Sequence, residues 1–129
     1  PSELGNLVRM RSWFQFQINE LTGQLPTEFG KLVELEEMFA LEFCEFSGSI
    51  PSQYGRLARM SSYFGISSNP KLGNTIPSQL GQLKEMQKKF RIFDNALSLA
   101  IPTQLGQLGQ MSSLLYLHSN SLTSMIPTQ

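Results

Sequence analysis

Ile101-Pro102-Thr103-Gln104-Leu105-Gly106-Gln107-Leu108 is the clearest copy of an eight-residue phrase that recurs along the chain. Earlier copies occupy residues 25–32, 50–57 and 76–83. A fixed period of 20 to 50 residues is typical of stacked-repeat solenoids, in which each unit buries its apolar residues against its neighbours. The sequence therefore predicts a solenoid rather than a globule with one central core. The proline of the phrase recurs at intervals of 25, 25, 26, 25 and 25 residues, at Pro1, Pro26, Pro51, Pro77, Pro102 and Pro127.

Each repeat, numbered from its proline as position 1, contains two apolar patterns. Positions 4, 7 and 10 are apolar, and this spacing of three predicts a short helical or 3-10 segment that begins at the proline. Positions 14 and 16 are apolar in every repeat, and this alternation predicts a short strand. Position 19 is asparagine except at Cys44, and its amide is expected to bond backbone groups of the next turn and the neighbouring repeat.

Glycine or asparagine then follows in three repeats at a place that suits a tight turn with positive φ. Leu99 and Ser124 occupy this place in the last two repeats, so we expect those repeats to turn differently. The dipeptide Pro70-Lys71 marks a one-residue insertion that lengthens the third repeat to 26 residues.

The repeats resemble the leucine-rich repeat family, in the plant-type subclass that reads roughly L-x-x-L-x-L-x-x-N-x-L-x-G-x-I-P-x-x-L-G-x-L. Residues 19–26 and 120–123 are close matches, and the resemblance covers the whole chain. Residues 101–108 with Met111 also look like leucine-rich repeats of microalgae such as diatoms. The resemblance implies an α/β repeat solenoid, a right-handed coil with short parallel strands on the concave face and short helical or 3-10 segments on the convex side.

The resemblance also implies a domain organisation. We expect residues 1–129 to form one solenoid without native caps, as a fragment of a longer protein, with repeats at 1–25, 26–50, 51–76, 77–101 and 102–126. The period departs from the usual 24 of the plant type, because an extra residue lies between positions 10 and 19. This insertion leaves open whether position 13 faces the core or the solvent.

Charge and composition narrow the classes of partner. Lysine plus arginine and aspartate plus glutamate each number 10, so the net charge is zero, which argues against a general nucleic-acid or anionic-lipid binder. The charge is unevenly distributed along the chain. Residues 26–50 carry six glutamates, whereas most of the charged residues within 51–101 are lysine or arginine. The acidic repeat is either a solvated face or a docking patch for a basic partner. At no point does the chain reach the roughly 18 consecutive apolar residues that span a membrane, so it is not expected to be membrane-spanning itself.

Candidate binding residues lie on the expected strands. If positions 14 and 16 face inward, positions 15 and 17 face solvent on the concave side. Aromatic residues and arginine are enriched at binding hot spots. Phe93 and Tyr116 are candidates whichever way position 13 points. The full set of partner-binding candidates is Phe93, Tyr116, Arg91, His118, Trp13, Tyr63 and Glu42.

Catalytic and cofactor motifs are lacking in this sequence. His118 is the single histidine, with no expected metal partners and no nucleophile at a matching position. The repeated glycines lack the spacing of a phosphate loop. Cys44 is either a reactive thiol or, as we favour, a small buried substitute for the position-19 asparagine. We therefore expect no enzymatic activity and no cofactor.

The expected function is a non-catalytic protein–protein interaction module, the leucine-rich repeat segment of a scaffold or receptor. Two alternatives remain open: a structural subunit embedded in a large multiprotein assembly, and a ligand-sensing ectodomain fragment of a receptor kinase. The resemblance to this family implies that the protein is secreted or located at the cell surface. The lack of any Asn-x-Ser/Thr sequon and the single cysteine mildly favour an organelle or the cytosol.

Overall fold

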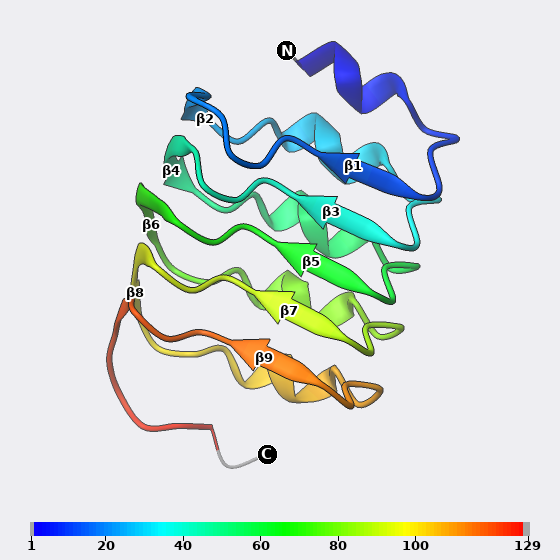
Figure 1. Ribbon diagram of the computed structural model, residues 1–129. Coiled ribbons are helices and arrows are strands. Elements are labelled where there is room, and N and C mark those ends of the chain that lie inside the picture. The colour runs from blue at the N-terminus through cyan, green and yellow to red at the C-terminus, as the bar shows by residue number, and fades with distance from the viewer. Residues whose placement is uncertain (1, 128–129) are drawn as a thin grey trace.

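The computed structural model describes residues 2–127, so Pro1, the first proline of the repeat series, and Thr128 and Gln129 lie outside the described residues. Each turn of the coil contains a 3-10 segment followed by two short strands (Figure 1). The 3-10 segments are η1 (Ser2–Asn6), η2 (Thr27–Lys31), η3 (Ser52–Arg56), η4 (Ser78–Gln82) and η5 (Thr103–Gln107).

A proline precedes each of the segments η2 to η5 for a physical reason. Pro26, Pro51, Pro77 and Pro102 precede η2 to η5 with φ between −62° and −65°, which the pyrrolidine ring favours. The Pro26 carbonyl accepts a hydrogen bond from the amide of Phe29, which closes the first turn. The predicted segments are therefore confirmed, with the helical part confined to positions 2 to 6.

The strands form two parallel sheets, one on each side of the turn at position 18. The first sheet has the order β1-β3-β5-β7-β9 and faces the viewer in Figure 1. Its strands are β1 (Trp13–Gln15), β3 (Met38–Ala40), β5 (Tyr63–Gly65), β7 (Lys89–Arg91) and β9 (Leu114–Tyr116). These short parallel strands confirm the predicted solenoid architecture.

The second sheet was not predicted from the sequence. Its order is β10-β8-β6-β4-β2, with β2 (Thr22–Gln24), β4 (Glu45–Ser49), β6 (Asn69–Asn74), β8 (Asn95–Leu99) and β10 (Ser121–Leu122). The Pro70-Lys71 insertion lies in β6, where the register with β8 shifts between Asn69 and Gly73. The extra residue is thus absorbed as a bulge-like irregularity that leaves the first sheet in register.

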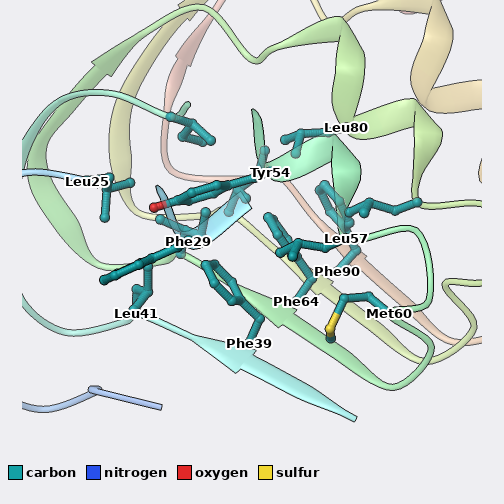
Figure 2. Close-up of a cluster of buried hydrophobic side chains, with 14 of the residues drawn as sticks. Leu25, Phe29, Phe39, Leu41, Tyr54, Leu57, Met60, Phe64, Leu80 and Phe90 are labelled. Carbon is teal, nitrogen blue, oxygen red and sulfur yellow. The ribbon is translucent and has the colours of Figure 1, made fainter. Parts of the chain in front are cut away.

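The core is a column of aromatic rings beneath the first sheet. Phe14, Phe39, Phe64 and Phe90 stack from repeat to repeat, with ring centroids 5.7, 5.5 and 5.2 Å apart. Phe39 meets the ring of Tyr54 in η3 edge to face, with ring centroids 5.1 Å apart (Figure 2). The Tyr54 hydroxyl donates to the Pro26 carbonyl at 3.0 Å. Because position 14 points inward, positions 13 and 15 project from the opposite side of the strand. The structure therefore settles the open question: position 13 faces outward.

A ladder of position-19 side chains connects the turns. The Asn69 amide donates to the Leu41 carbonyl of the preceding repeat at 2.9 Å, and its oxygen accepts from the Phe46 amide. Cys44 is buried, and its thiol makes the equivalent contact to the Phe16 carbonyl at 3.4 Å. The prediction that Cys44 substitutes for the ladder asparagine is confirmed.

Two turns in every repeat have positive φ. The first is at position 18, where the five residues have φ between 53° and 60°. The second includes Gly23, Gly48 and Asn74, and Leu99 (φ 66°) and Ser124 (φ 73°) adopt it as well. The expectation that the last two repeats turn differently is therefore wrong, because Leu99 and Ser124 adopt the same left-handed backbone as the earlier repeats.

Ion pairs join acidic residues of the second repeat to basic residues of neighbouring repeats. Lys71 pairs with Glu45 at 2.9 Å, and Arg59 contacts both Glu34 and Glu36. Arg11 approaches Glu34 from the other side at 3.6 Å. Three glutamates of the second repeat, Glu34, Glu36 and Glu45, are thus paired with cations of neighbouring repeats. In the part of the chain that the structure describes, no helix is long and apolar enough to cross a membrane.

Candidate functional site

Six of the seven candidate residues lie together on the outer face of the first sheet. Tyr63 begins β5, Arg91 ends β7 and Tyr116 ends β9. The other three follow β3, β7 and β9 by two residues, which places them at the same end of the sheet. We call Glu42, Tyr63, Arg91, Phe93, Tyr116 and His118 the concave cluster.

A polar network links three repeats within this cluster. The Arg91 guanidinium donates from Nη1 to the Tyr63 hydroxyl, and that hydroxyl donates to Oε2 of Glu42. Arg91 Nε lies 3.6 Å from the other carboxylate oxygen, Oε1, which is an ionic contact without a hydrogen bond. The buried carboxylate is therefore compensated by one phenol and one cation, as burial of a charge requires.

The prediction that Glu42 faces solvent is wrong, because only 2% of it is exposed. A Cβ added at Gly65 would lie 2.6 Å from the Tyr63 ring and 2.8 Å from the Glu42 carboxyl carbon. Gly65 thus leaves the space in which Tyr63 and Glu42 meet. Glu42 positions its neighbours rather than contacting a partner itself.

Burial and the carboxylate act together on Tyr63. Burial, followed by the hydrogen bond to Glu42 and its charge, raises the pKa of Tyr63 to about 12, while Arg91 acts in the opposite direction. The phenol is therefore protonated at neutral pH. It can donate to Glu42 and accept from Arg91 at the same time.

The remaining cluster residues form an aromatic surface around the arginine. The Arg91 guanidinium lies over the Phe93 ring at 4.9 Å and near the Tyr63 ring at 5.6 Å. His118 stacks on Phe93 with ring centroids 4.7 Å apart, and Tyr116 meets Phe93 edge to face at 6.1 Å. Cation–π contacts of this kind hold a side chain in one orientation. The result is a preorganised patch of π faces beside one cation.

Trp13 lies apart from the concave cluster. It is 59% exposed on β1, at the far end of the position-13 column. A groove lined by Trp13, Met38, Tyr63 and Lys89, with Glu37, Ser62 and Lys88 beside them, connects it to Tyr63. Lys89 also lies 5.9 Å from the Tyr63 ring centroid.

Metal-binding groups do not gather in the part of the chain that the structure describes. Among residues 2–127, no three or more histidine, cysteine, aspartate or glutamate side chains come close enough to hold a metal ion. His118 has the Ser119 hydroxyl 3.1 Å from its Nδ1.

Comparison with known families and with curated proteins gives no match. Solved structures do match. The plant peptide hormone receptor RGFR1 in complex with RGF2 is 32% identical, with a TM-score of 0.88 over 98% of this chain and 19% of that chain. This chain has the plant-type leucine-rich repeat fold.

Other solved structures show the same likeness. A plant ice-binding protein is 26% identical with a TM-score of 0.85, over 98% of this chain and 39% of that chain. The Arabidopsis receptor kinase HAESA, in complex with the peptide hormone IDA and the co-receptor SERK1, is 26% identical with a TM-score of 0.83, over 98% and 20%. This chain therefore spans between about a fifth and two fifths of the length of these proteins.

Sequence reasoning missed Lys89 and the network beneath Tyr63. Lys89 shares position 13 with Trp13 and Tyr63. Its place in the groove beside them could be predicted only once it was known that position 13 faces solvent. One signal was present in the sequence: a glycine inside a strand often marks a close approach of neighbouring groups. Gly65 is such a glycine, between Tyr63 and the Glu42 carboxylate.

Proposed function

We propose that this chain is a non-catalytic protein–protein interaction module that docks a protein partner through its concave cluster. Tyr63, Arg91, Phe93, Tyr116 and His118 would form the contact surface. Glu42 would hold Tyr63 and Arg91 in place from below.

The observation that carries this proposal is the packing of the aromatic patch. The Phe93 ring contacts both the Arg91 guanidinium and the His118 ring, at 4.9 and 4.7 Å. Because these side chains already support one another, binding of a partner would cost little rotamer entropy on this surface. Preorganised aromatic residues and arginine are the residues that dominate binding energy at protein interfaces.

The similar structures give independent support. RGFR1 is seen in complex with RGF2, and HAESA with the peptide IDA and the co-receptor SERK1. These are proteins of the same fold whose described complexes contain peptide or protein partners. A protein partner is therefore a reasonable expectation for this chain as well.

The test is the double substitution Phe93→Ala and Tyr116→Ala. A partner captured from an extract of the source organism would be identified by mass spectrometry, purified, and titrated against both proteins by calorimetry. Loss of the aromatic anchors is expected to weaken the affinity by roughly thirtyfold, as for hot-spot truncations of about 2 kcal/mol.

Val33→Ala provides the control, since this exposed valine lies in the turn after η2, away from the cluster. It should bind the partner like the unmodified chain. An unchanged affinity of the Phe93 and Tyr116 double variant, with its fold intact by circular dichroism, would exclude docking through the concave cluster.

A second candidate is a ligand-sensing segment of a receptor ectodomain. The naming of RGFR1 and HAESA as receptors favours it, although they share no more than 32% identity with this chain. The full coding sequence tests this candidate directly. A membrane span and kinase domain downstream of these repeats would support it, and a stop codon soon after residue 129 would exclude it.

A further inference from the structure

The groove beside the concave cluster carries charges of both signs that the protein itself does not pair. Glu37 lines this groove on the second repeat, and Lys88 and Lys89 line it on the fourth. All three side chains are exposed, and none of them forms an ion pair among residues 2–127. Glu37 differs in this from Glu34 of the same repeat, which two arginines contact.

The hydrogen bonds of the first sheet determine how far apart these charges are attached. The Tyr63 amide donates to the Glu37 carbonyl, and the Lys89 amide donates to the Ser62 carbonyl, each at 2.9 Å. Glu37, Ser62 and Lys88 are thus equivalent residues of three successive repeats. Two strand spacings of about 4.8 Å, or roughly 9.6 Å, separate the backbones of Glu37 and Lys88.

The residues that carry these charges lie inside the stack. They belong to β3 and β7 or directly precede these strands, and the order of the sheet places β1 beside β3 and β9 beside β7. Each of these repeats therefore has a neighbour on both sides. The exposure of the charges is a property of the concave face and does not arise from an uncovered end of the stack.

An aromatic ring lies between the two sets of charges. Tyr63 lines the groove on the intervening repeat, and the Lys89 ammonium lies 5.9 Å from its ring centroid. Met38 is the one aliphatic side chain among the described residues that line the groove. A bound amphipathic helix needs a broad apolar groove, whereas polyproline II segments bind to grooves lined by aromatic rings. The composition of this groove therefore fits a polyproline II segment.

The dimensions of a polyproline II helix match the spacing of the charges. Three residues rise about 9.3 Å and complete one turn, so residues three apart project from the same side. An extended strand places residues of one side about 6.6 or 13 Å apart, which matches less well. A basic residue over Glu37 and an acidic residue three positions away, over Lys88 and Lys89, would meet both charges at once.

We propose that this groove binds a polyproline II segment of a protein partner, with lysine or arginine at Glu37 and aspartate or glutamate three residues away at Lys88 and Lys89. Complementary charges of this kind determine which segment binds and in which register. The inference rests on the proposed function, because Tyr63 belongs to both surfaces. It adds the chemistry of the bound segment, which the aromatic patch does not specify.

Phage display tests the proposal before any natural partner has been identified. Random 12-residue peptides selected on the immobilised chain are expected to become enriched in an oppositely charged pair three residues apart, with proline between or beside the two. A selected synthetic peptide is then titrated against the chain by calorimetry. Moving its acidic residue one position closer to the basic one, with the composition unchanged, should weaken binding by roughly two- to fivefold, as loss of an exposed ion pair does.

A double-mutant cycle assigns each charge of the peptide to its partner in the groove. The Lys88→Gln and Lys89→Gln double variant should bind the selected peptide roughly fivefold more weakly. It should bind a peptide whose acidic residue is changed to glutamine as well as the unmodified chain does. Glu37→Gln should lose affinity only for peptides that retain the basic residue. Lys84→Gln and Glu85→Gln make the same charge changes just after η4, outside the groove, and should leave the affinity unchanged.

The groove proposal and the proposed function can fail separately. The Phe93→Ala and Tyr116→Ala double variant should bind the selected peptide normally, even where it loses the partner. Enriched peptides that share no three-residue spacing would overturn the groove proposal, and so would a charge pair seven residues apart, which fits the rise of about 10.5 Å along an α-helix. An affinity that the Lys88 and Lys89 double variant does not change would overturn it as well. None of these results would contradict docking of a partner through the concave cluster.

Discussion

Leu99 illustrates how stacking can override the preference of a single residue. It occupies a turn with φ of 66° that Gly23 and Gly48 adopt without steric cost. Its side chain is 59% exposed, so the burial of apolar surface offsets little of the strain in the backbone. The neighbouring repeat holds the backbone through the hydrogen bond from the Thr123 amide to the Leu99 carbonyl at 2.9 Å.

Leu99→Gly is therefore expected to stabilise the protein. Relief of the left-handed strain is worth about 1–2 kcal/mol, and the added flexibility of glycine in the unfolded chain offsets part of it. We expect the free energy of unfolding to rise by about 0.5–1 kcal/mol in a urea titration followed by circular dichroism.

Gly48→Ala is the reciprocal control. Gly48 has φ of 80°, and an added Cβ would lie 3.3 Å from Cγ of Gln24. This substitution should lower the free energy of unfolding by about 1 kcal/mol. Equal stabilities for the Leu99→Gly variant and the unmodified chain would show that the turn is not strained.

The 3-10 segments pack through a contact that only glycine allows. A Cβ added at Gly30 in η2 would lie 2.5 Å from the Gln53 carbonyl oxygen of η3, and the same approach recurs between successive segments. The glycine of the Pro-x-x-Leu-Gly-x-Leu phrase thus sets the spacing of the convex side. The period of the sequence revealed this glycine, whereas its reason became visible only when adjacent segments were placed together.

Gly30→Ala should consequently be one of the more damaging single-methyl additions to this chain. The segments η2 and η3 must separate or shift, and overpacking of this kind costs about 1–3 kcal/mol. We expect a clearly lower melting temperature for Gly30→Ala in differential scanning calorimetry.

Gly109→Ala serves as the comparison, because the nearest atom to its added Cβ is the Gln107 carbonyl oxygen at 4.0 Å. That variant should melt close to the unmodified chain. Similar losses for the two variants would mean that the close contact with η3 does not determine the effect.

Over the whole molecule, the buried Tyr54 and the half-buried Tyr63 connect stability to alkaline pH. The pKa of Tyr63 is raised to about 12 by burial and Glu42, and burial with the charge of Glu28 raises the pKa of Tyr54 further. Both phenols keep their protons in the folded chain above pH 10, where the unfolded chain releases them. Their contribution to stability is thus complete below about pH 10 and is lost as the pH rises toward 12 and beyond.

Unfolding should accordingly require less urea at pH 11 than at pH 9. Tyr63→Phe removes one of the two groups, so the difference between the two pH values should be smaller in that variant. Absorbance at 295 nm should show the Tyr63 titration near pH 12 in the folded protein, and this step should disappear in Tyr63→Phe. An identical pH dependence for the two proteins would contradict the assignment.

The sequence by itself determined the repeat, the 3-10 segments, the inward strand positions and the role of Cys44, because each follows from local spacing repeated five times. Tertiary structure decided the rest. Position 13 points outward, Glu42 is buried, and a second sheet forms by pairing residues of successive repeats, such as Gly23 with Phe46. The concave cluster exists because Tyr63 and Arg91 from successive repeats fold over one carboxylate, in the space that Gly65 leaves. Contacts between repeats depend on how far and in which direction each side chain extends toward the next repeat. The spacing of residues within one repeat does not determine this.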